Sequence, residues 1–272
     1  MFEILLPPFI ACLILTGIHA YLGVHVVERK VIFVDLSLAQ IAALGTAIGA
    51  MIGFEYGGTI SYLMGLSFTL VGATIFALTR MRKEKVPQEA IIGIVYAVSA
   101  AAFILIMDRA PEGAEKIKGM LVGSILFVDW HTIIKTASLY SLIGLFHYIF
   151  RKKFITISLD PQKAFDAGIS VRFWDFLFYA SFGFVVTSSV LIAGVLLVFS
   201  FLVVPSVCAI LFSKNIKTRL IIGWSLGFAA SLLGILASMW LDVPTGAAIV
   251  CMFGFLLILS GIGSVMLNNK KT

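Results

Sequence analysis

Residues 174–212 read WDFLFYASFGFVVTSSVLIAGVLLVFSFLVVPSVCAILF, and this stretch decides the fold class. An α-helix rises about 1.5 Å per residue, so about 20 apolar residues suffice to cross the hydrocarbon core of a bilayer. The stretch is therefore too long for one crossing. We predict two membrane helices, divided near Ser188–Gly194.

The rest of the chain also consists mainly of long apolar runs. Of its 272 residues, 60% are hydrophobic and only 12% are charged, whereas soluble domains carry about 25% charged residues. We predict an all-α, polytopic membrane helix bundle of nine transmembrane helices, or eight if one run is re-entrant, in a single transmembrane domain over 1–272. The other apolar runs are 4–24, 31–53, 58–79, 90–107, 129–150, 219–241 and 246–267.

The basic residues occur in short bursts between the apolar runs, which indicates membrane topology rather than nucleic-acid binding. On the nine-helix path, one side of the membrane holds 16 of the 20 Lys and Arg residues. This bias predicts a cytoplasmic C-terminus and an outward N-terminus. The 16 are Arg29, Lys30, Arg80, Arg82, Lys83, Lys85, Arg151, Lys152, Lys153, Lys163, Arg172, Lys214, Lys217, Arg219, Lys270 and Lys271.

Motifs of several enzyme classes are absent from the sequence. There is no G-x-x-x-x-G-K-[ST] phosphate-binding loop and no H-E-x-x-H. The three cysteines, Cys12, Cys208 and Cys251, lie far apart inside apolar runs, so neither a disulfide framework nor a thiolate metal cluster is expected. We therefore predict that the chain is not an enzyme.

The longest polar connection, at about 151–173, is predicted to contain a short helix on the cytoplasmic side. Asp160 followed by Pro161 is typical of a helix start, because the carboxylate caps free N–H groups and proline fits the first helical position. Gly168 can end the helix in a left-handed conformation. Local features alone leave open whether this is an ordinary loop helix or a docking element.

Ionisable groups inside a membrane are costly and are functional candidates by default. Asp35 is interpreted as the only acidic residue well inside an apolar run; Gln40 follows it near the predicted midplane, and His19 lies on the preceding helix. Carboxylate, amide and imidazole groups suit a divalent first-row metal. The alternative is that Asp35 is satisfied by a neighbouring helix or by Arg29 or Lys30.

The remaining histidines are expected to have ordinary roles. His25 and Glu28 are three residues apart and can pair near the inner interface. His131 and His147 are expected at the membrane interfaces, where aromatic and polar side chains gather.

Several segments, in order, resemble the permease subunits of the zinc/manganese/iron group of ABC importers. The resemblance spans nearly the whole chain, and its strength is in the ordered set of motifs rather than in any one of them. These segments are Leu22–Gly45, Gly119–Val128, Asp160–Ala164–Gly168, Gly194 through Pro205 to Ala209, and Asp242-Val-Pro244-Thr-Gly246.

The resemblance implies that Asp160, Ala164 and Gly168 mark a coupling helix that docks onto a separate ATP-binding cassette subunit. It also implies transport of a divalent metal ion (zinc, manganese or iron), an extracytoplasmic metal-binding protein and a second copy of the permease. ATP would bind the partner subunit, and no cofactor is expected on this chain. Such a homodimer would sit among lipids in a prokaryotic cytoplasmic (inner) membrane.

One departure from the family pattern concerns the metal. The family's second helix carries G-D-x-L-[SA]-H-A, but here Gln40 stands at the histidine position and Asp35 lies one residue early. Because an amide oxygen is a harder and weaker ligand than imidazole, zinc becomes less favoured relative to manganese or iron. The alternative function is an ion- or proton-coupled secondary transporter, for which the sequence has no convincing internal repeat.

Overall fold

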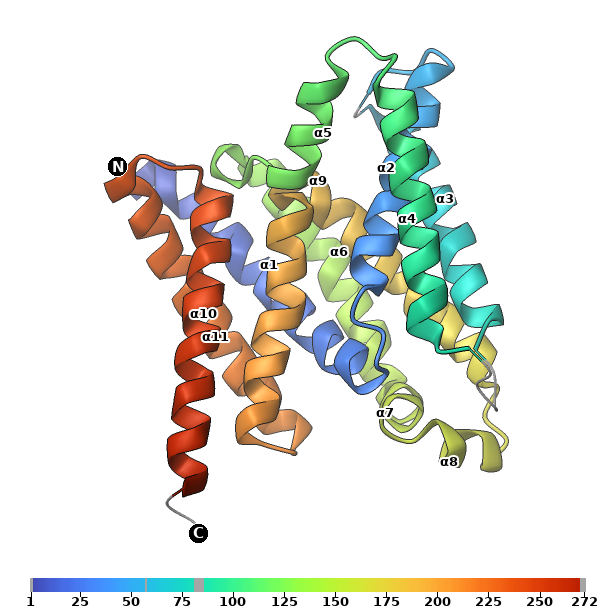
Figure 1. The fold of residues 1–272 in the computed structure, drawn as a ribbon, viewed down its shortest axis with the longest axis vertical. Helices are drawn as coiled ribbons and strands as arrows, with labels where there is room; N and C mark the ends of the chain where they lie inside the picture. The colour runs from blue at the N-terminus through green and yellow to red at the C-terminus, as the bar shows by residue number, and fades with distance from the viewer. Residues whose placement is uncertain (1, 57, 81–85, 270–272) are drawn as a thin grey trace. The chain divides into compact units, whose positions relative to one another are not determined.

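A computed structural model of the chain describes residues 2–56, 58–80 and 86–269, and the described part contains helices and no strands (Figure 1). Of the basic residues used above, Arg82, Lys83, Lys85, Lys270 and Lys271 lie outside it. The elements are α1 (Phe2–Glu28), α2 (Val34–Met51), α3 (Thr59–Leu78), α4 (Gln88–Met107), α5 (Gly113–Val122), η1 (Ile125–Phe127), α6 (Trp130–Ile149), α7 (Arg151–Leu159), α8 (Pro161–Asp166), α9 (Val171–Phe212), α10 (Ile216–Leu241) and α11 (Thr245–Asn269).

Within the described residues, seven helices are long and apolar enough to cross a membrane: α1, α2, α3, α4, α9, α10 and α11. The pair α6 and α7, bent by 76°, supplies an eighth. Gly194 interrupts α9 with a φ of 76° and a ψ of 159°, inside the interval where the sequence predicts a division. The predicted polytopic helix bundle is confirmed. The number of crossings depends on whether α6 and α7 form one span and on whether the two parts of α9 are counted separately.

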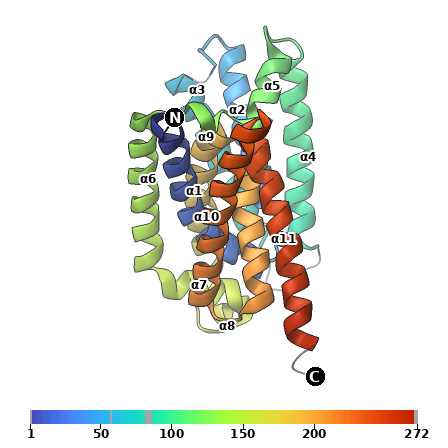
Figure 2. The same cartoon turned by 90° about the vertical axis from the view of Figure 1, so that its left-hand side faces the viewer.

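The chain forms two compact units, a division of which the composition gives no sign. The first unit consists of Met1–Val27, Val122–Ser141 and Ile192–Thr272. In it α10 and α11 pack side by side (Figure 2). Small residues bring its helices together, as helix packing in lipid requires: the α-carbon of Gly23 has no room for a β-carbon beside Leu202 of α9.

The second unit consists of Glu28–Leu121 and Leu142–Leu191. Its centre is α2, which packs against both α3 and α4 and is mostly buried. Gly45 makes the close approach possible, because a β-carbon there would lie 2.7 Å from the carbonyl oxygen of Met64. Within this unit, α5 lies at one end, and α7 and α8 lie at the opposite end (Figure 1).

Candidate functional site

The helix predicted from Asp160 and Gly168 is present as α8 (Figure 1). At its start, Oδ1 of Asp160 accepts a hydrogen bond of 3.0 Å from the backbone N–H of Lys163, and Pro161 occupies the first turn. Both features satisfy or remove amide groups that have no partner inside the helix. The predicted helix start is confirmed.

The end of α8 has the hydrogen bonds of a Schellman motif. Gly168 adopts a φ of 71°, its N–H donates to the carbonyl of Phe165 at 3.1 Å, and the N–H of Ile169 donates to that of Ala164 at 3.0 Å. A left-handed residue is needed for this pattern, and glycine adopts it without steric cost. Ala164 is fully buried, so α8 is anchored through it. The exposed side chains of α8 are Gln162, Lys163 and Asp166.

The helix that precedes α8 was not predicted. The sequence indicates a polar connection over 151–173, but residues Arg151–Leu159 form α7. Phe154 of α7 is fully buried and stacks on His147, with ring centroids 4.3 Å apart. His147 is 1% exposed and its Nε2 lies 2.8 Å from Oγ of Ser181. The ring of His147 therefore packs inside the second unit, and its position at the membrane interface remains a prediction.

Asp35 and Gln40 lie on α2 in the second unit, and both are buried. Asp35 is 1% exposed, and neither of its carboxylate oxygens has a hydrogen-bond partner among the described residues. The Oε1 atom of Gln40, 5% exposed, also lacks one there. Arg29, one of the partners considered for Asp35, instead binds Asp175. Asp35 lies in the first turn of α2, where the helix dipole favours a negative charge.

His19 belongs to α1 in the first unit, where its side chain is fully buried. Its Nδ1 lies 2.8 Å from the carbonyl oxygen of Leu15, and its ring meets Tyr140 edge to face. A carbonyl only accepts hydrogen bonds, so Nδ1 of His19 carries a proton. This orientation by a backbone carbonyl is common among metal-binding histidines.

Among the residues described, no three or more His, Cys, Asp or Glu side chains form a group that could hold a metal ion. The structure thus contains the three predicted ligands as buried polar groups, two on α2 and one on α1. That Asp35, Gln40 and His19 act together on a metal remains a prediction.

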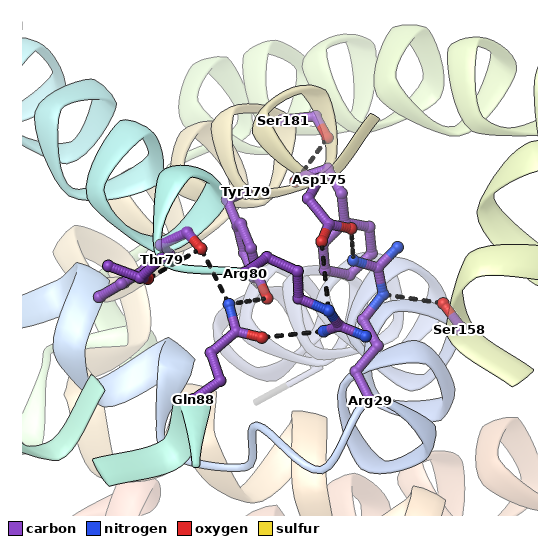
Figure 3. Close-up of polar contacts among 10 residues, drawn as sticks. Arg29, Thr79, Arg80, Gln88, Ser158, Asp175, Tyr179 and Ser181 are labelled. Carbon is purple, nitrogen blue, oxygen red and sulfur yellow. Dashed lines mark hydrogen bonds and ion pairs between the residues drawn. The ribbon is translucent and has the colours of Figure 1, made fainter. Parts of the chain in front are cut away.

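A buried ionic network in the second unit was missed by sequence reasoning (Figure 3). Nη1 of Arg29 lies 2.5 Å from Oδ1 of Asp175, and Nε of Arg80 lies 3.7 Å from its Oδ2. Arg29 also donates from Nε to Oγ of Ser158 on α7 at 2.8 Å. Asp175 is fully buried, and both arginines are 5% exposed. The interpretation of Asp35 as the only well-buried carboxylate is therefore wrong.

Gln88, the first residue of α4, extends this network. Its Oε1 accepts a hydrogen bond of 2.8 Å from Nη1 of Arg80. Its Nε2 lies 2.9 Å from the carbonyl oxygen of Phe76 and 3.2 Å from the hydroxyl of Tyr179. The side chain thus uses both its acceptor and its donors inside the protein (Figure 3).

Comparisons with known proteins bear on what these features serve. The model of the ABC 3 transport family matches residues 1–264. A probable iron transport system membrane protein of Haemophilus influenzae is 26% identical over all of this chain and 98% of its own length. The manganese transport system membrane protein MntC of Listeria monocytogenes is 27% identical over 71% of each chain.

The fold is also found among solved structures. A chain of PsaBC from Streptococcus pneumoniae, solved in complex with a Fab, matches with a TM-score of 0.79 at 21% identity, covering 96% of this chain and 91% of the other. An inward-facing putative metal-chelate type ABC transporter matches with a TM-score of 0.72 at 20% identity, covering 95% and 85%. Because the family match spans nearly the whole sequence, this integral membrane protein belongs to the ABC 3 transport family.

Proposed function

We propose that the chain is the transmembrane permease subunit of an ATP-driven importer of divalent metal ions, with manganese and iron favoured over zinc. The family match carries the proposal, and the relatives are named as manganese and iron transport proteins. Buried oxygen donors at Asp35 and Gln40 support the harder metals. His19 is the third proposed ligand of the metal during its passage.

In this proposal the driving force comes from a partner. The sequence has no phosphate-binding loop, so a separate ATP-binding cassette subunit hydrolyses ATP and docks on α8 through Gln162, Lys163 and Asp166. Two copies of the permease enclose one pathway, and an extracytoplasmic protein delivers the metal. Closure of the ATPase pair pushes α8 and switches the pathway between its two openings.

Co-purification tests this assignment. The tagged chain, extracted from its native membrane in mild detergent, is expected to retain an ATPase subunit, and uptake of radioactive manganese or iron is expected to require ATP. Charge reversal of Asp160 and Asp166 together should abolish both the association with the ATPase and the uptake of metal. No associated ATPase, combined with intact uptake by the reversed variant, would contradict the proposal. Uptake by vesicles that contain this chain alone without nucleotide would favour a secondary transporter.

Replacing Gly168 by alanine is expected to weaken ATPase docking. A residue with a β-carbon costs about 1–2 kcal/mol in the left-handed region, so the end of α8 rearranges. We expect the affinity of the purified permease for its ATPase to fall about tenfold, measured by titration in detergent. Ala167→Ser is the control, because Ala167 is exposed and has an ordinary φ of −79°. Equal affinities for the two variants would show that this conformation is not needed for docking.

A further inference from the structure

The buried network joins five segments of the second unit at the end that carries α7 and α8 (Figures 1 and 3). Arg29 follows α1, Ser158 lies on α7, Asp175 and Tyr179 lie on α9, Arg80 follows α3, and Gln88 begins α4. These segments are distant in sequence: Arg29 is 129 residues from Ser158 and 146 residues from Asp175. A movement of one segment therefore changes contacts to several others.

Arg29 is held on three sides. Its Nη1 pairs with Asp175, its Nε donates to Ser158, and its guanidinium lies over the ring of Phe178 with 4.0 Å to the centroid. A planar guanidinium with these fixed donor directions orients its partners more strictly than a flexible ammonium would. Burying a charged pair is costly and gives little net stability against an apolar replacement. The presence of the Arg29–Asp175 pair is better explained by the geometry that it imposes on the segments around it.

The network also reaches the start of α2, which bears Asp35. Arg29 is four residues before Phe33, the residue that precedes α2. The backbone N–H of Phe33 donates to Oε1 of Glu89 at 3.0 Å, and Glu89 directly follows Gln88 in α4. The start of α2 is thus connected to the network in two ways. Arg29 lies four residues before Phe33 in the chain, and Glu89, next to Gln88, accepts a hydrogen bond from Phe33.

On its other side the network reaches α8. Ser158 is the second residue before Asp160, whose side chain caps α8. Ser158 is buried, so its hydroxyl faces the protein interior while the exposed side chains of α8 remain accessible. A displacement of α7 and α8 must move the Ser158 hydroxyl relative to Arg29, or carry Arg29 with it.

We propose that Arg29, Asp175 and Ser158 are positioning residues for transport: they link the motion of α7 and α8 to the start of α2 and so to Asp35. This inference rests on the proposed importer function, because it assigns the route by which docking of the ATPase affects the metal pathway. The residues do not touch the metal or ATP. They determine how much transport each ATP hydrolysis produces.

The sharpest test is Ser158→Ala, which removes one hydroxyl from the link and leaves the Arg29–Asp175 pair in place. The permease and its ATPase are reconstituted in proteoliposomes, and manganese uptake and ATP hydrolysis are measured together. We expect the uptake per ATP to fall about fivefold, the scale on which single contacts modulate coupling between sites. Thr156→Ala is the matched control, because among the described residues the Thr156 hydroxyl bonds only within α7, to the carbonyl of Lys152. Uptake per ATP equal to wild type in Ser158→Ala would overturn the inference.

A second pair of variants separates coupling from folding. Asp175→Asn removes the carboxylate charge, whereas Asp175→Glu retains it. We expect Asp175→Asn to bind the ATPase and hydrolyse ATP with reduced uptake per ATP, and Asp175→Glu to restore part of that ratio. If Asp175→Asn does not assemble, Ser158→Ala decides the question alone. If wild-type vesicles show no ATP-dependent uptake, the importer function fails. If wild-type uptake is normal and the uptake per ATP is unchanged in Ser158→Ala and in Asp175→Asn, only the positioning role is contradicted.

Discussion

Gly23→Ala is expected to destabilise the first unit strongly. A β-carbon at Gly23 would lie 2.0 Å from the carbonyl oxygen of Leu202 and 2.4 Å from Oγ of Ser206. The first contact is with backbone, which cannot rotate away as a flexible side chain can. Overpacking in a close-packed interior costs about 1–3 kcal/mol, and contact with backbone places this change at about 3 kcal/mol. We expect a clearly lower midpoint of thermal unfolding, followed by tryptophan fluorescence in detergent.

Gly17→Ala provides the matched control on the same helix. A β-carbon there meets nothing within 4 Å, so alanine adds no clash. Because alanine is about 0.5–1 kcal/mol better than glycine in a helix interior, the control is expected to be neutral or slightly stabilising. If both variants unfolded at the same temperature, the close approach of α1 to α9 would not contribute to stability.

The membrane helices could be predicted because their signal is local and long. The run 58–79 corresponds to α3 (Thr59–Leu78), and the run 129–150 to α6 (Trp130–Ile149). In a bilayer each crossing helix satisfies its own backbone hydrogen bonds, so composition alone defines it. The short helix α7 could not be found in this way. It begins with three basic residues, and its buried Phe154 and Ile157 are too few to form an apolar run.

The same distinction applies to the polar sites. The caps of α8 were predictable, because Asp160 and Gly168 act on backbone groups within a few residues of themselves. The pair Arg29–Asp175 was not, since it joins residues 146 positions apart. Arg29 and Arg80 were counted as charges outside the membrane, and in the structure they are buried partners of Asp175. A single sequence contains no local signal for such a pairing.

Asp35→Asn is expected to lower metal uptake while raising stability, a combination that distinguishes a functional carboxylate from a structural one. Asparagine has nearly the same size but no formal charge. The carboxylate of Asp35 is buried and has no hydrogen-bond partner among the described residues, so its charge is costly in the folded protein. Neutralising it should raise stability by about 1–2 kcal/mol. Uptake of manganese and iron should fall about tenfold or more, because an uncharged amide is a weaker ligand for a divalent cation.

Ser37→Ala is the control that isolates the charge. Ser37 is fully buried two residues further along α2, and its Oγ likewise lacks a hydrogen-bond partner in the described part of the chain. Removing this hydroxyl should also raise stability slightly, but it should leave uptake unchanged because no charge is lost. A lower unfolding midpoint for Asp35→Asn with unchanged uptake would make Asp35 a structural residue. A higher midpoint with lost uptake means that the protein retains an unfavourable charge in its interior because the transported cation needs it.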